Sequence, residues 1–169
     1  MSVNPELLQY PELVKVHLQP GAFNSGLLAV KHFKAGQVIT RLSGTTHTAK
    51  SWSSVQSGIE PGDHIELNSV LVYVNHSCSP NAAFDLDSSN KAEWNFRALR
   101  DIQPEEELTF FYPSTEWDMD QGFPCRCQAK NCLGYIRGAK YLSRAQVAER
   151  EFISAYISRL LDQRDIQHI

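Results

Sequence analysis

The sequence predicts a mainly β protein of small sheets, with an α-helix in its last part. Two observations support this fold class. Short segments rich in β-branched and aromatic residues recur as far as Tyr112, with turn residues between them. Apolar residues at helical spacing appear in the segment after residue 143. The length of 169 residues and the 42% hydrophobic fraction suit one domain that buries a core.

The expected strands share a composition and a pattern. They combine β-branched or aromatic residues with partial alternation of apolar and polar positions. Turn residues, such as Pro20-Gly21 and Lys34-Ala35-Gly36, separate them. Trp94, Phe96 and Ala98 alternate with polar residues, as in a half-buried strand. The expected strands are residues 12–19, 27–30, 37–42, 65–74, 94–98 and 108–112.

Other segments lack this pattern. Residues 43–64 are rich in Ser, Thr and Gly without clear periodicity, so we expect a loop or a short helical insert there. Residues 85–91 form a polar hairpin tip, and residues 101–107 form an acidic turn.

The last part of the chain predicts one helix from about residue 143 to residue 163. Ser143 and Gln146 match a capping box at its start. We interpret its apolar stripe as core packing, and a weak dimer contact between two such helices is the second interpretation. The stripe consists of Val147, Ile153, Tyr156, Ile157, Leu160 and Leu161.

Composition excludes several classes of function. The net charge of −3 argues against a nucleic-acid partner, which requires a strongly basic face. No apolar run is long enough for a transmembrane helix, and residues 1–10 do not resemble a signal peptide. We therefore expect an intracellular protein, in the cytoplasm or the nucleus, without membrane attachment. In such a reducing compartment, clustered cysteines indicate metal binding or catalysis rather than disulfides.

All four cysteines lie in two stretches of the chain. Cys125, Cys127 and Cys132 fall within eight residues, and Cys78 lies in the polar segment 75–81. A structural zinc site needs four nitrogen or sulfur ligands, so Cys78 is the candidate for the fourth. Zinc would then join the two stretches and close a long loop. Two alternatives are four buried free cysteines and a catalytic pair of Cys78 with His76.

Together the two stretches resemble the SET domain, the fold of most protein lysine methyltransferases. Residues 75–81 (Asn-His-Ser-Cys-Ser-Pro-Asn) are similar to the family's Asn-His-Ser-Cys-x-Pro-Asn signature. Residues 106–112 are similar to its Glu-Glu-Leu-Thr-Phe-Asp-Tyr segment, and Asn24-Ser25-Gly26 stands at its Gly-x-Gly turn. Residues 125–134 resemble the zinc-binding post-SET tail, whose fourth ligand is the signature cysteine.

The resemblance covers residues 12–137 and looks like the short stand-alone SET proteins of bacteria and fungi. It implies a β-clip fold of small curved sheets, in which one segment threads under a loop as a pseudoknot. The implied organisation is a SET domain at residues 12–114 and a zinc-binding post-SET segment at residues 115–137. Residues 138–169 would then be a C-terminal helical extension packed on the same domain.

The resemblance also implies the chemistry, which is S-adenosylmethionine-dependent N-methylation of a protein lysine beside a structural Zn²⁺. An in-line displacement needs an aligned cofactor, a neutral amine and the exclusion of water. Tyr112 is the implied catalytic tyrosine, whose hydroxyl orients the amine near the transferring methyl group. The implied substrate channel contains Tyr73, Arg97 and Phe111. The implied cofactor-binding residues are Asn24, Ser25, Gly26, Asn75, His76, Tyr112 and Tyr135.

Three residues depart from the family pattern. Asn24 replaces a glycine, although asparagine tolerates a positive φ. Phe111 replaces a polar residue before the tyrosine. Arg97 stands where Phe or Tyr is common, and a cation there would repel a lysine ammonium unless it faces solvent. These departures motivate two other hypotheses, a small-molecule methyltransferase and a non-enzymatic SET interaction protein. Acidic residues could attract a basic substrate, although exposed acidic turns are usually only solvated; they are Glu105, Glu106, Glu107, Glu116, Asp118 and Asp120.

Overall fold

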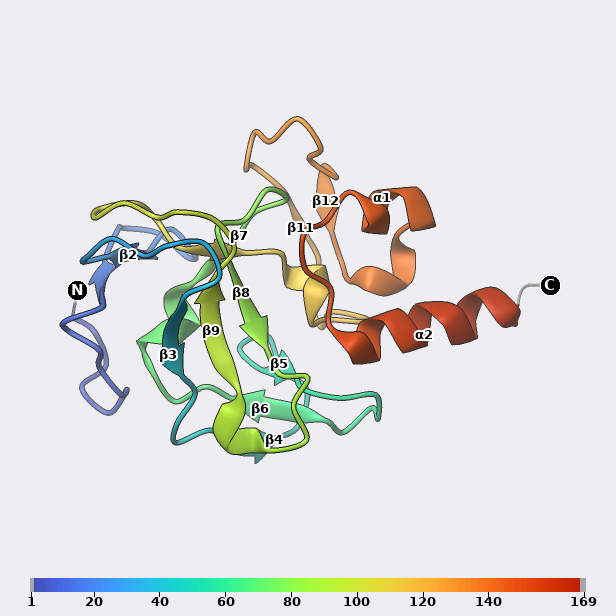
Figure 1. Ribbon diagram of the computed structural model, residues 1–169, viewed down its shortest axis with the longest axis horizontal. Coiled ribbons are helices and arrows are strands. Elements are labelled where there is room, and N and C mark those ends of the chain that lie inside the picture. Colours follow the sequence, from blue (N-terminus) through green and yellow to red (C-terminus); the bar gives the residue numbers. More distant parts are fainter. Residues whose placement is uncertain (1, 168–169) are drawn as a thin grey trace.

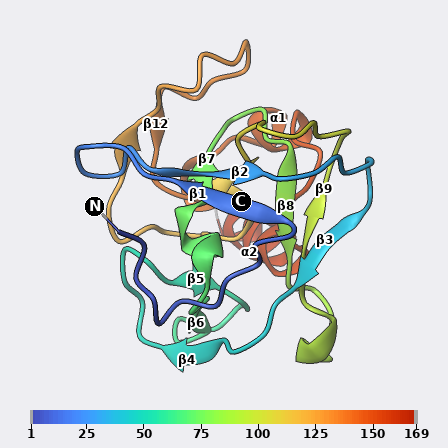
Figure 2. The same cartoon turned by 90° about the vertical axis from the view of Figure 1, so that its left-hand side faces the viewer.

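The computed structural model describes residues 2–167 and confirms the mainly β fold class. In this part of the chain the strands form five small sheets of two or three strands each. Figures 1 and 2 show the first hairpin and the last helix at opposite ends of the long axis. None of the described helices has the length and apolar character that crossing a bilayer requires.

The sheets join segments that are distant in the sequence. β1 and β2 form an antiparallel hairpin, and β3, β9 and β8 form a sheet in that order. β4, β6 and β5 form the second three-stranded sheet, β7 pairs in parallel with β10, and β11 pairs with β12. The strands are β1 (Val14–His17), β2 (Gly26–Ala29), β3 (Val38–Arg41), β4 (Thr46–Thr48), β5 (Val55–Gln56), β6 (His64–Glu66), β7 (Asn75–His76), β8 (Ala82–Asp85), β9 (Asn95–Ala98), β10 (Thr109–Phe110), β11 (Phe123–Pro124) and β12 (Tyr135–Ile136).

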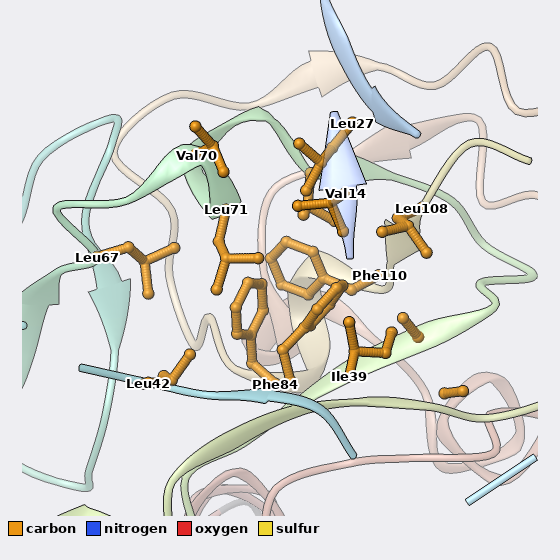
Figure 3. Close-up of a cluster of buried hydrophobic side chains, with 14 of the residues drawn as sticks. Val14, Leu27, Ile39, Leu42, Leu67, Val70, Leu71, Phe84, Leu108 and Phe110 are labelled. Carbon is orange, nitrogen blue, oxygen red and sulfur yellow. The ribbon is translucent and has the colours of Figure 1, made fainter. Parts of the chain in front are cut away.

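Buried aromatic and aliphatic side chains of these sheets form the main core (Figure 3). The ring centroid of Phe84 lies 4.6 Å from that of Phe96 and 4.8 Å from that of Phe110, so β8, β9 and β10 meet at one aromatic cluster. Phe96 and its strand neighbours alternate in burial, as the sequence predicts for residues 94–98. The core therefore fixes the strand that leads into Tyr112.

Asn81 holds the crossing of two distant segments. Its buried side chain donates to the carbonyl of Glu107 at 2.8 Å and accepts from the Thr109 N–H at 2.9 Å. Its own carbonyl accepts from the Leu99 N–H. Because a buried amide must satisfy its hydrogen-bonding groups, Asn81 binds residues 107–109 beside the signature segment. The parallel pairing of β7 with β10 extends this contact.

Two expected elements differ from the structure. Residues 70–74 were expected to continue a strand, but Val70–Tyr73 is a 3₁₀ helix whose first turn is capped by the Ser69 side chain. Short buried apolar runs have the same sequence pattern in both structures. Residues 43–64, expected to be a loop or a short helical insert, contain β4, β5 and the first residue of β6. β5 is too short to show a periodic pattern in the sequence. It is a strand because it pairs with β6.

The single C-terminal helix expected at 143–163 is wrong, because α1 (Arg144–Ala148) and α2 (Ala155–Ile166) are separate. The capping box of Ser143 and Gln146 is confirmed. Where α2 begins, the Ser154 N–H donates to the Ser114 carbonyl and the Ala155 N–H donates to Asp87, so both groups bind outside the helices. The core-packing interpretation of the stripe is confirmed for its buried members, which are Tyr156, Ile157 and Leu161.

Candidate functional site

Tyr112 follows the end of β10 by two residues and begins a 3₁₀ helix (Tyr112–Ser114), in which Pro113 is the second residue. Its N–H donates to Nδ1 of His76 at 3.1 Å, and its hydroxyl donates to the Val74 carbonyl at 3.1 Å. Both partners belong to or adjoin β7, so the signature segment fixes the backbone and the ring of Tyr112. Burial, and then the carboxylates of Glu116 and Glu107, raise the pKa of Tyr112. The phenol is therefore protonated at neutral pH.

His76 is a neutral, buried ring in this site. Burial, and next the Arg150 guanidinium, lower the pKa of His76 to about 3. Since Nδ1 accepts from the Tyr112 N–H, the ring proton is on Nε2, which lies 3.3 Å from the Cys78 sulfur. A nitrogen that carries a proton cannot accept the thiol proton, so this tautomer does not suit the alternative of a catalytic Cys78–His76 pair.

Asn75 joins the turn at residues 24–26 to the segment at residues 106–112. Its side-chain amide donates to the Ser25 carbonyl and to Oε1 of Glu107, each at 2.9 Å. Gly26 lies against this pair, because a Cβ there would be 2.6 Å from Glu107 Oε1. The left-handed residue of the turn is Phe23, with a φ of 61°, rather than the expected Asn24. Gly26 therefore provides space for the Asn75–Glu107 contact.

Replacing Gly26 by Ala is expected to break this contact and to weaken S-adenosylmethionine binding by about tenfold, the loss of one charge-assisted hydrogen bond. The added Cβ would lie 2.6 Å from Glu107 Oε1, so the Glu107 carboxylate would have to move from its position beside Asn75. Isothermal titration calorimetry measures the change. Gly62→Ala is the control, because a Cβ on Gly62 meets no atom within 4 Å. Equal affinities for both variants would contradict this account.

The structure brings the four cysteine sulfurs together, all within 4.8 Å of one another. The Cys78–Cys125 sulfur distance is 3.9 Å, and a tetrahedral zinc site with bonds of about 2.3 Å has sulfur edges of about 3.8 Å. The Leu133 N–H donates to the Cys78 sulfur, and the Gly134 N–H donates to Cys132. Backbone donors of this kind stabilise thiolates. Only Cys78 is fully buried, which does not fit the alternative of four separate core cysteines.

The remaining predicted residues are not brought into one cluster. Tyr135, in β12, is 53% exposed and packs beside Gly122. Phe111 is buried, and the Arg150 guanidinium lies 4.8 Å from its ring centroid. Tyr73, in the 3₁₀ helix, packs on the main core.

Arg97 does not face solvent freely. Its side chain is 30% exposed, its Nε lies 3.4 Å from Asp85, and its guanidinium lies 5.1 Å from the Phe152 ring. Arg97 therefore contacts the segment between α1 and α2. No pattern in the sequence indicated this contact, since Phe152 lay inside the expected single helix.

Glu116 was grouped with exposed acidic residues, and this was wrong. The residue is only 9% exposed, and Oε1 accepts from the Gln56 N–H at 2.9 Å and from the Thr115 hydroxyl at 3.2 Å. Gln56 also accepts from the Tyr156 hydroxyl, so the carboxylate lies where β5, the Tyr112 segment and α2 meet. Burial raises the pKa of Glu116 to about 7, against the opposite effect of these hydrogen bonds.

The raised pKa of Glu116 predicts a pH-dependent stability. Between the ordinary value of 4.5 and about 7, the folded protein binds more protons than the unfolded chain. The contribution of this group to the free energy of unfolding therefore falls as pH rises through this window, by on the order of 3 kcal/mol. Glu116→Gln removes this dependence, because an amide does not titrate. The amide oxygen can still accept the hydrogen bond from the Gln56 N–H.

Urea unfolding from about pH 5 to about pH 8 tests this prediction. The stability of Glu116→Gln relative to the wild type is expected to increase with pH. The same substitution at the exposed Glu151 is the control and is expected to leave the pH profile unchanged. Parallel pH profiles for the wild type and Glu116→Gln would rule out a buried carboxyl with a raised pKa.

Comparisons with known proteins show the family of this chain. The SET domain family profile matches residues 24–113. The methyltransferase flvH of Aspergillus flavus is 37% identical over 155 residues, which cover 90% of this chain and 83% of that protein. The H3 lysine-4 specific histone-lysine N-methyltransferase of Emericella nidulans is 36% identical over 78 residues, which cover 44% of this chain and 6% of that protein.

Among solved structures, the methyltransferase domain of human histone-lysine N-methyltransferase SETMAR is similar, with a TM-score of 0.50 and 18% identity. The match covers 68% of this chain and 54% of that one, and it supports the fold. The profile match includes the turn at Asn24-Ser25-Gly26, the signature segment and Tyr112. The chain therefore belongs to the SET-domain family of methyltransferases.

Proposed function

We propose that this chain transfers the methyl group of S-adenosylmethionine to an amine nitrogen, with Tyr112 at the reacting atoms. The observation that carries the proposal is the double attachment of Tyr112 to β7, through His76 and through the Val74 carbonyl. A residue held at both its backbone and its hydroxyl is preorganised, which is what an in-line transfer requires.

The residues present fit the cofactor in their chemistry. Amide and carbonyl groups of Asn75, His76 and the turn at residues 24–26 suit a polar amino-acid moiety, and the exposed ring of Tyr135 suits an aromatic base. Asn24, Ser25, Gly26, Asn75, His76, Tyr112 and Tyr135 are the proposed binding residues. When bound, S-adenosylmethionine supplies an electrophilic methyl group on a sulfonium.

Tyr112 acts on the acceptor amine in this proposal. Its hydroxyl donates a hydrogen bond to the Val74 carbonyl. The lone pairs of the hydroxyl oxygen therefore remain available to accept a hydrogen bond from an N–H of the substrate amine. Because its pKa is raised, the phenol does not place an anion beside the amine. The aromatic rings of His76 and Phe123 pack against Tyr112 and limit the access of water.

We further propose a structural Zn²⁺ on Cys78, Cys125, Cys127 and Cys132. The sulfur geometry and the backbone donors support this ligand set. Four thiolates leave no open position, so the ion would stabilise residues 115–137 against the SET domain at residues 12–114 rather than act on substrate. Residues 138–169 remain the proposed helical extension. The intracellular location and the monomeric or weakly dimeric state remain predictions.

Two acceptor classes fit an amine methyltransferase, a lysine in a basic protein and a small-molecule amine. The family's histone-lysine enzymes favour the first. Phe111 and Arg97 favour the second, because neither supplies a negative charge that would attract a lysine ammonium. The test is mass-spectrometric detection of methyl transfer from labelled cofactor to a panel of basic peptides and a panel of small amines. Turnover of neither panel would contradict the proposed enzyme and favour a non-catalytic SET protein.

A further inference from the structure

The segment between α1 and α2, residues 149–154, carries contacts that the functions above leave unexplained. In Figure 1 this segment runs from α1 back toward the centre of the molecule before α2 begins. Arg150 and Phe152 lie within it, and they contact Phe111 and Arg97, two residues that the family resemblance assigns to the substrate channel. The segment therefore reaches the site from a part of the chain outside the SET domain match.

Each of the three nitrogen atoms of the Arg150 guanidinium donates a hydrogen bond to a backbone carbonyl. Nε donates to the Gln146 carbonyl at 3.0 Å, Nη1 donates to the Cys78 carbonyl at 2.7 Å, and Nη2 donates to the Asn131 carbonyl at 3.0 Å. The acceptors belong to α1, to the signature segment and to residues 125–134, which carry three of the cysteines and are called the cysteine loop below. A planar fork of donors suits such a set of fixed carbonyls, and a lysine ammonium would not reach all of them.

The same guanidinium also contacts the residue that directly precedes Tyr112. It lies 4.8 Å from the centroid of the buried Phe111 ring, a cation–π distance. Cys78 is two residues beyond His76, and Phe111 directly precedes Tyr112. Arg150 therefore contacts a residue close in sequence to each partner of the His76–Tyr112 hydrogen bond, and one of these residues, Cys78, is also a proposed metal ligand.

Two later residues of the segment make further contacts with distant parts of the chain. Phe152 lies over the Arg97 guanidinium, and Ser154 donates to the Ser114 carbonyl at 3.0 Å. These contacts give a structural reason for two departures from the family pattern. Phe111 provides an apolar face for one guanidinium, and Arg97 provides a guanidinium for one aromatic ring.

We infer that Arg150 is a positioning residue for methyl transfer, which couples the cysteine cluster to Tyr112. This inference rests on the proposed function for its catalytic readout. Loss of the guanidinium would free the Cys78 and Asn131 carbonyls and loosen the packing of Phe111. The cysteine loop and the catalytic tyrosine would then lose their common support.

Arg150→Met and Arg150→Lys test the inference, with Arg144→Met as the matched control. Arg144 also joins α1 to α2, but it does so through the surface carboxylates Asp162 and Asp165. Three quantities are measured: zinc release to a chelator, hydrogen exchange of the amides of residues 110–112 and 125–134, and kcat per titrated cofactor site. Counting titrated sites removes unfolded molecules from the rate.

Both Arg150 variants are expected to release zinc about tenfold faster and to lower kcat about tenfold, as substitutions behind metal ligands commonly do. Exchange is expected to accelerate at both sets of amides, with no change in Arg144→Met. The lysine variant keeps the charge, so failure to restore kcat would identify the fork geometry as the cause. Zinc release and exchange equal to the wild type in both Arg150 variants would overturn the inference. Since these readouts need no turnover, an inactive wild type would contradict only the proposed function.

Discussion

Replacing Tyr112 by Phe is expected to lower kcat for methyl transfer by about 10²–10³-fold, with cofactor affinity within about threefold of the wild type. The substitution removes only the hydroxyl, which in the folded protein donates to the Val74 carbonyl. The ring keeps its packing on Phe110, His76 and Phe123, so the fold and the binding groups of β7 remain. Single-turnover kinetics with saturating cofactor measure the change directly.

Tyr141→Phe is the matched control for this experiment. Tyr141 also loses a hydroxyl that makes one hydrogen bond, to Asp118, but at an exposed position outside the proposed site. Its kcat is expected to equal that of the wild type. A Tyr112→Phe enzyme with a wild-type single-turnover rate would show that the hydroxyl does not act on the acceptor, and the assignment of Tyr112 would then be wrong.

Loss of one cysteine is expected to have the largest effect on stability. Cys125→Ser removes a thiolate from the cluster, so stoichiometric zinc binding is expected to be lost. Because zinc binding energy is folding energy, the melting temperature is expected to fall by about 10 °C, at about 2–4 °C per kcal/mol for a domain of this size. A chelator should produce the same fall in the wild type. Metal analysis and calorimetry measure the two effects together.

Arg126→Ser is the control for the cysteine substitution. Arg126 lies between two of the clustered cysteines, is exposed and offers no metal ligand. This variant is expected to keep one zinc ion per chain and a melting temperature close to that of the wild type. Full stability of Cys125→Ser, or of the wild type in chelator, would contradict a structural zinc ion.

Local signals in the sequence were sufficient for much of the site. The polar segment at Asn75–Asn81 and the three clustered cysteines predicted which segments meet, and the sulfur atoms do lie together. Alternation around Phe96 predicted β9, and the capping box predicted the start of α1. In each case the pattern is contained within a few residues, so a single sequence can report it.

Tertiary contacts account for what the sequence did not predict. Glu116 looks like any acidic turn residue, and its burial depends on Gln56, sixty residues earlier in the chain. The break between α1 and α2 contains neither Pro nor Gly. It follows from contacts of Arg150 and Ser154 with distant carbonyls. Such residues have no periodicity or spacing that would mark them, because their partners are not neighbours in the sequence.

The most direct test of the account is a calorimetric titration of the zinc-replete protein with S-adenosylmethionine, beside a metal analysis of the same sample. The account predicts one zinc ion per chain and one cofactor site, with a dissociation constant on the order of micromolar. One zinc ion without cofactor binding would contradict the proposed methyltransferase site, and the SET fold of this chain would then serve another purpose.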